Sequence, residues 1–330
     1  KPILCRVGGD EFNIIIENIN SEKDIEIICK NILSELEHPI IVDAHKFYIS
    51  GSIGIAMYPK HNGTLLDLIK FADTAMFKAK ELGKNNCQFY SSDMTEEAIE
   101  RSELDVFLRD AIKNNEFHLV YQPQVNALNK EIIGVETLIR WVHDGKFIPP
   151  DKFICIAENN GYIHEIDRWV MKHAMEEINR WYKQGIFDGN LSVNVSIKEL
   201  QRDDFLDNLK SILHMTNFNP KKLEIELTES VMIKNAEKII EILNKVSDLG
   251  IKISIDDFGT GYSSISYLTK LPLTKLKIDK SFIQEIFDSK ESELVVKTII
   301  GLSKGLNLDL IAEGVEEESE RNFLIKHECT

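Results

Sequence analysis

Apolar residues recur with two different spacings along the first 92 residues. Intervals of three and four residues predict amphipathic helices, and short dense runs predict strands. The helices are expected at 21–37 and 65–82, and the strands at 47–58 and 87–90. Pro39 and Gly83 follow the two helices, as is common for residues that end helices. This part of the chain is therefore expected to be α/β.

A Gly-Gly pair interrupts the apolar pattern near the start of the chain. Gly8 and Gly9 lie between two apolar stretches, and Asp10 and Glu11 follow them. Glycine accepts positive φ angles, so the pair predicts a tight hairpin between two strands.

A charged helix is expected over about 95–113, behind the capping residues Ser91, Ser92 and Asp93. We place the domain boundary on this helix. The expected division is a first domain over 1–92, a helical linker over 93–114 and a second domain over 115–330.

From Glu116 on, the apolar runs predict a second, more regular arrangement. Seven strands are expected at 117–125, 132–141, 191–196, 222–228, 252–257, 274–278 and 308–312. Most gaps between them have helical periodicity, as in the stripe from Ile163 to Trp181. Strands that mostly alternate with helices indicate an α/β fold, here a TIM-like (β/α)8 barrel short of its last unit.

Unusual polar residues lie within or at the end of each of these strands. They are Gln122, Glu136, Asn194, Glu226, Asp256, Asp257, Lys277, Asp279 and Glu313. One polar residue at a strand end is usually a turn or capping group. In a barrel, however, the C-terminal strand ends form one face, and a set drawn from all seven strands favours a shared site there.

The side chains of this set indicate a metal centre. Carboxylates that converge on one point repel one another unless cations lie between them, and all-oxygen ligands select Mg²⁺ or Mn²⁺. The adjacent Asp256 and Asp257 suit a carboxylate that bridges two ions, a common arrangement for phosphate-ester cleavage. Lys277 would stabilise the transition state or the attacking hydroxide. Arg140 shares a strand face with Glu136 and would meet a phosphate.

Two neighbouring motifs leave alternatives open. The Gly-rich stretch from Asp257 to Ser264 is either a plain turn between strand and helix or an active-site loop. Glu229, within Thr228-Glu229-Ser230, either begins a helix or holds the neighbouring loop.

Composition and charge restrict the classes of partner. The formal net charge of −15 disfavours a nucleic-acid polymer but leaves room for a small anionic ligand. No apolar run approaches the roughly 20 residues of a membrane span. The five scattered cysteines favour free thiols, and hence a cytoplasmic protein, over disulfides or zinc. The chain starts without Met inside an expected strand, so we expect a longer parent protein, whose upstream region would carry any membrane anchor.

The second half resembles the EAL-domain family of cyclic di-GMP phosphodiesterases. The matching stretches are 121–123, 136–141, 147–150, 157–158, 193–196, 226–230, 256–261, 277–279 and 312–316. The resemblance implies that cyclic di-GMP is hydrolysed to linear pGpG and that the domain forms a homodimer.

The same resemblance implies a role for each polar residue. Metal ligands would be Glu136, Asn194, Glu226, Asp256 and Asp257, with two Mg²⁺ or Mn²⁺ ions. Catalytic assistance would come from Glu313, Lys277 and Asp279, and Glu229 would stabilise the loop after the Asp pair. Gln122 and Arg140 would face the substrate. The chain departs from the family at Thr137, where the signature has Ala, and in ending before the last strand, so we expect an open barrel.

The first half resembles the C-terminal part of a GGDEF diguanylate cyclase domain, which has a nucleotidyl-cyclase-like α/β fold. The matching stretches are 8–12, 52–56, 72–80 and 83–85. The resemblance implies that Gly8 and Gly9 approach the phosphates of GTP and that Asp10 and Glu11 serve metal binding and catalysis. Pro2 stands where an inhibitory product site would need Asp, so product inhibition by that route is not expected.

Three functions are weighed for the second half. The favoured one is the phosphodiesterase, because every metal ligand that the sequence covers is present. The first alternative is a receptor that binds the dinucleotide without cleaving it. The second is a metal-dependent barrel that acts on a small phosphorylated or carboxylated metabolite. The GGDEF half would either synthesise cyclic di-GMP or bind GTP and regulate its neighbour.

Overall fold

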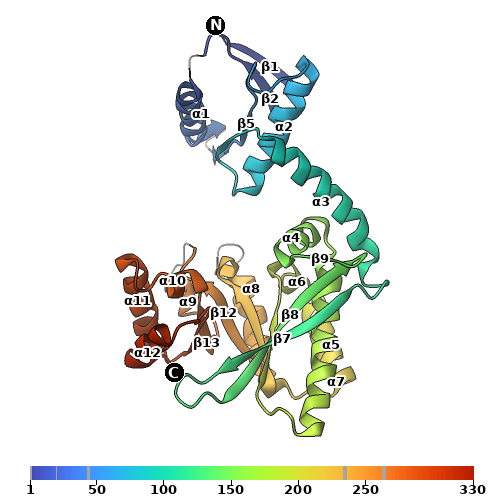
Figure 1. Ribbon diagram of the computed structural model, residues 1–330, viewed down its shortest axis with the longest axis vertical. Coiled ribbons are helices and arrows are strands. Elements are labelled where there is room, and N and C mark those ends of the chain that lie inside the picture. Colours follow the sequence, from blue (N-terminus) through green and yellow to red (C-terminus); the bar gives the residue numbers. More distant parts are fainter. Residues whose placement is uncertain (1, 20, 43–44, 233–235, 262–264) are drawn as a thin grey trace. The chain divides into compact units, whose positions relative to one another are not determined.

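The structure is a computed structural model that describes residues 2–19, 21–42, 45–232, 236–261 and 265–330. The chain forms two compact units, residues 1–103 and 104–330 (Figure 1). All five cysteines are free. Among the described helices, none is both long and apolar enough to cross a membrane.

The described residues of the first unit form three small two-stranded sheets. A hairpin joins β1 (Ile3–Gly8) to β2 (Glu11–Ile15), as the Gly-Gly pair predicts. The antiparallel pair β3 (Ile40–Val42) and β4 (His45–Phe47) and the parallel pair β5 (Ile53–Ile55) and β6 (Cys87–Phe89) follow. The single strand expected over 47–58 is wrong. Phe47 pairs with β3 and Ile53–Ile55 pair with β6, so the residues between β4 and β5 connect two sheets.

The first two helices of the chain begin at well-formed caps. Helix α1 (Glu22–Leu36) starts at Ser21 and α2 (Leu65–Glu81) starts at Thr64, each in a capping box with an aspartate three residues later. The cap satisfies backbone N–H groups that have no partner within the helix. Helix α3 (Ser92–Ala111) follows β6 and runs on into the residues of the second unit.

The second unit is a curled, mostly parallel sheet with helices packed on it (Figure 1). The sheet order is β14-β13-β12-β11-β10-β8-β7, and β9 pairs with β8. The strands are β7 (Phe117–Val125), β8 (Ile132–His143), β9 (Lys146–Ile148), β10 (Asn190–Asn194), β11 (Leu223–Thr228), β12 (Lys252–Phe258), β13 (Lys275–Ile278) and β14 (Asp309–Ala312). The α/β, TIM-like fold class is confirmed.

Two details of this sheet differ from the expected barrel. Strand β7 is antiparallel to β8, while the other strands of the sheet order are parallel. The connection over 126–131 is too short for the crossover that parallel neighbours require, so a hairpin forms instead. Strand β9, which pairs with the end of β8, was not expected.

Helices connect the parallel strands. Their bounds are α4 (Pro150–Asn160), α5 (Ile163–Gln184), α6 (Ile197–Leu200), α7 (Phe205–Thr216), α8 (Ala236–Asp248), α9 (Ile265–Leu268), α10 (Lys280–Gln284), α11 (Lys290–Leu306) and α12 (Glu318–Lys326). Short 3-10 turns are η1 (Pro220–Lys222) and η2 (Glu229–Met232). Helix α5 packs on β8 and β10, α8 on β12, and α11 on β13 and β14.

Both faces of the central strands are buried, but only one is apolar. In β11, the apolar Leu223, Ile225 and Leu227 alternate with Glu224 and Glu226, and all five are fully buried. Successive strand residues point to opposite faces, so the apolar set packs in the helix-covered core while the carboxylates line the inside of the curl. The fold thus directs polar residues of separate strands into one interior.

Candidate metal centre

Residues that lie within or directly after the parallel strands come close together inside the curled sheet. Glu136 lies in β8, Glu226 in β11, Asp256 in β12 and Lys277 in β13, and Glu313 directly follows β14. The parallel register aligns these positions, with the backbone of Glu313 bonded to the last residue of β13. Side chains far apart in sequence therefore converge at one place.

Lys277 is the centre of this cluster. Its side chain is 1% exposed, and its Nζ lies 2.7 Å from Glu226 and 3.0 Å from Glu136. The same atom lies 3.0 Å from Asp256 and 2.7 Å from Glu313. Burial alone would lower the pKa of Lys277, but these four carboxylates raise it well above its usual range. The lysine is therefore a fixed positive charge inside an acidic cage.

The carboxylates form two overlapping groups. One oxygen each of Glu136, Glu226 and Asp256 lies within 4.8 Å of the others, and the same holds for Asp256, Asp257 and Glu313. Asp256 belongs to both groups. Two overlapping sets of hard oxygen donors fit a pair of neighbouring divalent cations.

The electrostatics of the cluster also fit bound cations. Burial raises the pKa of Glu226 to about 8, and its acidic neighbours add to the shift while Lys277 opposes it. Burial likewise raises the pKa of Glu313 to about 7, against the effect of Lys277. The second carboxylate oxygen of Glu226 is buried and has no hydrogen-bond partner among the described residues. One lysine does not satisfy these acids, so the donor set has room for further positive charge.

Asn194 belongs to the same group of side chains. It ends β10, opposite Glu226 in the register, and its Nδ2 donates to Glu136 Oε1 at 2.9 Å. This contact orients the amide and leaves its oxygen as the atom available to a cation.

The Asp pair sits where β12 becomes irregular. The register with β13 shifts between Ile255 and Phe258, and Asp257 has a φ of 52°. Asp257 donates its backbone N–H to Asp256 Oδ1 at 3.0 Å. Burial raises the pKa of Asp257 to about 6, and Asp256 and a hydrogen bond with Asp279 contribute. The irregularity lets two consecutive carboxylates face the same cluster.

Asp279 has a separate structural contact. It caps α10 by accepting the backbone N–H of Ser281 at 2.9 Å. Burial opposes the shift, but the hydrogen bonds from Ser281 and Asp257 lower the pKa of Asp279. The charged form of Asp279 is therefore favoured beside Asp257.

Glu229 holds the loop that follows the Asp pair. It begins η2 and is 6% exposed, and its Oε2 accepts the backbone N–H groups of Gly259 at 3.0 Å and Gly261 at 3.2 Å. Both roles weighed for this motif therefore occur together. Tyr262, Ser263 and Ser264 lie outside the described residues.

Two expected substrate residues stand apart from these contacts. Gln122 is exposed and pairs with Glu136 across the β7–β8 hairpin. Arg140 lies further along β8, opposite His118, and donates from Nη1 to the carbonyl of Ile139 at 2.9 Å. Within the described part of the chain, no hydrogen bond or ion pair joins either side chain to the carboxylate cluster. Thr137, beside Glu136, is 2% exposed.

Several buried polar residues near the site were missed by sequence reasoning. Lys275 and Glu224 form a buried ion pair at 2.7 Å, each two residues before a member of the cluster. The two-residue spacing on a strand could have identified them, because it repeats the same face. Asp167 interrupts the apolar stripe of α5 between Ile166 and Val170, which is a weaker signal.

The Gly-Gly turn of the first unit has a different character. Gly8, Gly9, Asp10 and Glu11 are all exposed. Gly9 has a φ of 54°, and its carbonyl accepts two hydrogen bonds from the Arg6 guanidinium, at 2.7 and 3.1 Å. The turn is an open surface feature held by its backbone conformation.

Comparison with known proteins identifies two families. The EAL domain model matches residues 106–330, and the GGDEF model, described as diguanylate cyclase, matches residues 1–86. The bifunctional diguanylate cyclase/cyclic di-GMP phosphodiesterase MucR of Pseudomonas aeruginosa is 38% identical over the whole chain. The cyclic di-GMP phosphodiesterase PdeR of Escherichia coli is 35% identical over 98% of it. The chain spans about half the length of these relatives, 48% and 49% respectively.

A solved structure resembles the second unit. It is the PaMucR phosphodiesterase in complex with c-di-GMP, with a TM-score of 0.67 and 38% identity. The match covers 69% of this chain and 93% of that one. With its acidic interior and these similarities, the chain belongs to the EAL domain family and carries part of a GGDEF domain before the EAL domain.

Proposed function

We propose that the EAL unit hydrolyses cyclic di-GMP to linear pGpG. The observation that carries the proposal is the convergence of Glu136, Glu226, Asp256 and Glu313 on Lys277 within one buried cluster. The names of MucR and PdeR and the c-di-GMP complex of PaMucR support this choice of substrate. We take residues 1–92 as the partial GGDEF domain, 93–114 as the linker and 115–330 as the EAL domain.

The proposed ligands of the two metal ions are Glu136, Asn194, Glu226 and Asp256, with Asp257 on the second ion. Two Mg²⁺ or Mn²⁺ ions would lower the pKa of a water molecule and neutralise charge on the phosphate oxygens. The orphaned oxygen of Glu226 and the two overlapping carboxylate groups support this assignment.

The remaining residues would position and stabilise the reacting groups. Lys277 is held as a cation by its four partners and would place positive charge beside the scissile phosphate. Glu313, with its pKa raised to about 7, would accept a proton from the attacking water. Glu229 and Asp279 would fix the loops around Asp257. Gln122 and Arg140 would contact the dinucleotide, with Arg140 on a phosphate.

The GGDEF unit is proposed to bind GTP at the turn formed by Gly8, Gly9, Asp10 and Glu11. The exposure of all four residues and the left-handed backbone of Gly9 support this. Measuring cyclic di-GMP hydrolysis and synthesis with and without GTP separates regulation from synthesis. A lower KM for hydrolysis with GTP supports a regulatory unit, and net synthesis supports a cyclase.

The decisive experiment incubates the complete protein that carries this chain with cyclic di-GMP and Mg²⁺ or Mn²⁺. Linear pGpG is followed by chromatography for the wild type, Glu136→Ala and Glu176→Ala. Glu176 is an exposed acid on α5, so its variant is the matched control. We expect product from the wild type and the control and none from Glu136→Ala. Retained dinucleotide binding without product in the wild type would overturn hydrolysis and indicate a receptor.

A further inference from the structure

Helix α5 is bonded to the turn that follows Asn194. Asp167 on this helix accepts two hydrogen bonds from Ser196, from the backbone N–H at 3.0 Å and from the hydroxyl at 2.6 Å. Both bonds end on the same carboxylate oxygen, Oδ2. Ser196 stands two residues after Asn194, at the N-cap of α6. The backbone just beyond a proposed metal ligand is thus fixed to a helix that packs against β8 and β10.

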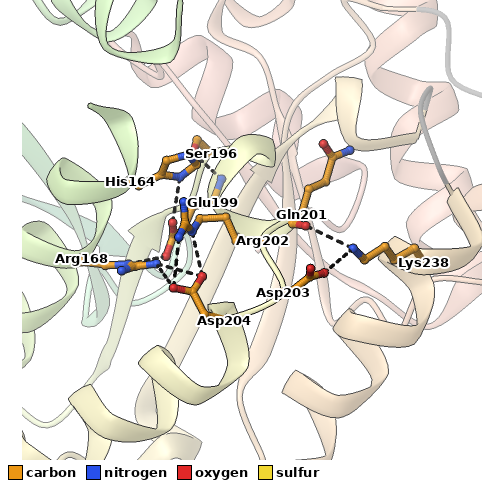
Figure 2. Close-up of polar contacts among 9 residues, drawn as sticks. All are labelled: His164, Arg168, Ser196, Glu199, Gln201, Arg202, Asp203, Asp204 and Lys238. Atoms are coloured by element: carbon orange, nitrogen blue, oxygen red, sulfur yellow. Dashed lines mark hydrogen bonds and ion pairs between the residues drawn. The ribbon is translucent and has the colours of Figure 1, made fainter. Parts of the chain in front are cut away.

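The same helix holds this turn at a second point, shown in Figure 2. The Glu199 carboxylate pairs with His164 Nδ1 at 2.9 Å and accepts from Arg168 Nε at 2.8 Å. Glu199 also donates its backbone N–H to Ser196 Oγ at 3.1 Å. Arg168 reaches on to Asp204 at 3.2 Å, near the start of α7. Ser196 is therefore bonded both to α5 and to a residue that α5 holds.

The two buried acids of this network differ in their partners. Glu199 is fully buried and is paired with the Arg168 guanidinium and the His164 imidazole. Asp167 is 7% exposed, and its contacts among the described residues include no cation. Burial raises the pKa of Asp167 to about 7, against the hydrogen bonds from Ser196. A buried acid without a counter-ion costs stability that an apolar residue in the same stripe would not. The two hydrogen bonds from Ser196 to Asp167 offset this cost.

We propose that Asp167 is a positioning residue that acts through Ser196 on Asn194, an inference that rests on the function proposed above. By fixing the turn, Asp167 holds the Asn194 amide with its nitrogen 2.9 Å from Glu136 Oε1 and its oxygen toward the proposed ion. Losing a group that bonds a metal ligand directly typically costs about 10- to 100-fold in metal affinity or activity, and Asp167, which acts through Ser196, should fall at the low end of this range.

The test measures Mn²⁺ affinity by titration calorimetry on the complete protein, without substrate. Asp167→Ala should bind Mn²⁺ about 10-fold more weakly than the wild type. Asp167→Asn retains a carbonyl oxygen for Ser196 and should stay within about threefold of the wild type. Glu165→Ala, which removes an exposed acid two residues away on α5, is the matched control and should bind normally.

A double variant separates positioning from a general structural role. If Asp167 acts through Asn194, then Asp167→Ala adds no further loss of Mn²⁺ affinity to Asn194→Ala. Additive losses, or a lower melting temperature of Asp167→Ala with unchanged Mn²⁺ affinity, overturn the proposal. If Asp167→Ala does not fold, Ser196→Ala takes its place. That variant loses only the hydroxyl bond and should weaken Mn²⁺ binding about threefold, whereas wild-type affinity would count against positioning.

Glu136→Ala in the same titration distinguishes the two proposals. Wild-type Mn²⁺ affinity in Glu136→Ala would reject the metal centre itself, and the role of Asp167 would fall with it. Weak binding in Glu136→Ala and Asn194→Ala, with wild-type affinity in Asp167→Ala, would reject only the positioning role.

Discussion

The two signature regions of this chain are built in opposite ways. The turn of the GGDEF unit consists of consecutive residues, Gly8 to Glu11, and all of them are exposed. The acidic cluster of the EAL unit takes residues from Glu136 to Glu313, and its central Lys277 is 1% exposed. The turn depends on one backbone conformation, whereas the cluster depends on the register of a whole sheet.

This difference predicts how each region responds to substitution. Each carboxylate paired with Lys277 has that lysine as its close positive charge, so removing the lysine leaves the acids buried without compensation. Side chains of the exposed turn are solvated in both folded and unfolded states, so their removal changes stability little. Substitutions should therefore affect stability and function together in the cluster, and function alone in the turn.

The largest expected effect follows from removing the central lysine. Lys277→Met leaves four carboxylates around an apolar side chain, and loss of one partner from a buried ion pair costs about 3–5 kcal/mol. Chemical denaturation in a chelating buffer measures this change. Lys290→Met, on an exposed position at the start of α11, is the matched control and should change stability by less than about 0.5 kcal/mol. Similar stabilities for the two variants would mean that the cluster does not depend on Lys277.

The next effect concerns pH and a buried acid outside the cluster. The folded pKa of Asp167 is raised to about 7 from its usual value of 3.8. Between these values the folded state binds the proton more tightly, so ionisation of Asp167 lowers stability as the pH rises. Asp167→Asn cannot ionise. Its stability relative to the wild type should therefore improve by roughly 2–4 kcal/mol between pH 4 and pH 8.

The free energy of unfolding of the wild type and of Asp167→Asn, measured at a series of pH values, gives this difference. The contributions of all other acids are common to both proteins and cancel when the two are subtracted. Most of the change should fall between pH 4 and pH 7. A difference that does not vary with pH would show that Asp167 is ionised at little cost.

A smaller effect is expected at the loop beside the Asp pair. Glu229→Ala leaves the N–H groups of Gly259 and Gly261 without their acceptor, at a cost of about 2 kcal/mol, and cyclic di-GMP turnover should fall with it. Glu229→Gln keeps one acceptor oxygen, so it should lose less stability and less turnover than Glu229→Ala. The measurement is chemical denaturation together with pGpG release. Unchanged turnover in Glu229→Ala would show that the loop does not need this contact.

The strands of the EAL unit could be predicted because buried strands leave dense apolar runs. The expected strand at 117–125 has the bounds of β7. Each of the other six expected strands begins and ends within two residues of the observed strand. What sequence pattern does not specify is the partner of a strand. The apolar run over 47–58 therefore predicts one strand although Phe47 and Ile53–Ile55 belong to different sheets, and the pattern does not give the direction of β7.

The same limit applies to the candidate site. Placing polar residues at strand ends anticipates a common location for Glu136, Glu226, Asp256 and Lys277, because topology brings such ends together. It does not give side-chain partners. Asp167 and Glu199 come from helices, where a buried polar residue looks like an ordinary irregularity until its hydrogen bonds are known.

The smallest stability effect should come from the GGDEF turn. It tests whether the side chains of an exposed turn contribute little to stability. Asp10 is exposed, so Asp10→Ala should change the free energy of unfolding by less than about 0.5 kcal/mol. Gly9→Ala places a side chain at a φ of 54° and should cost about 1 kcal/mol, which makes it the conformational reference for the same hairpin. Both variants are measured by chemical denaturation and by GTP binding with Mg²⁺. Weaker GTP binding in Asp10→Ala at unchanged stability would mean that the aspartate serves ligand binding and not folding. A stability loss in Asp10→Ala larger than that in Gly9→Ala would contradict the contrast between a turn held by its backbone and a cluster held by the sheet.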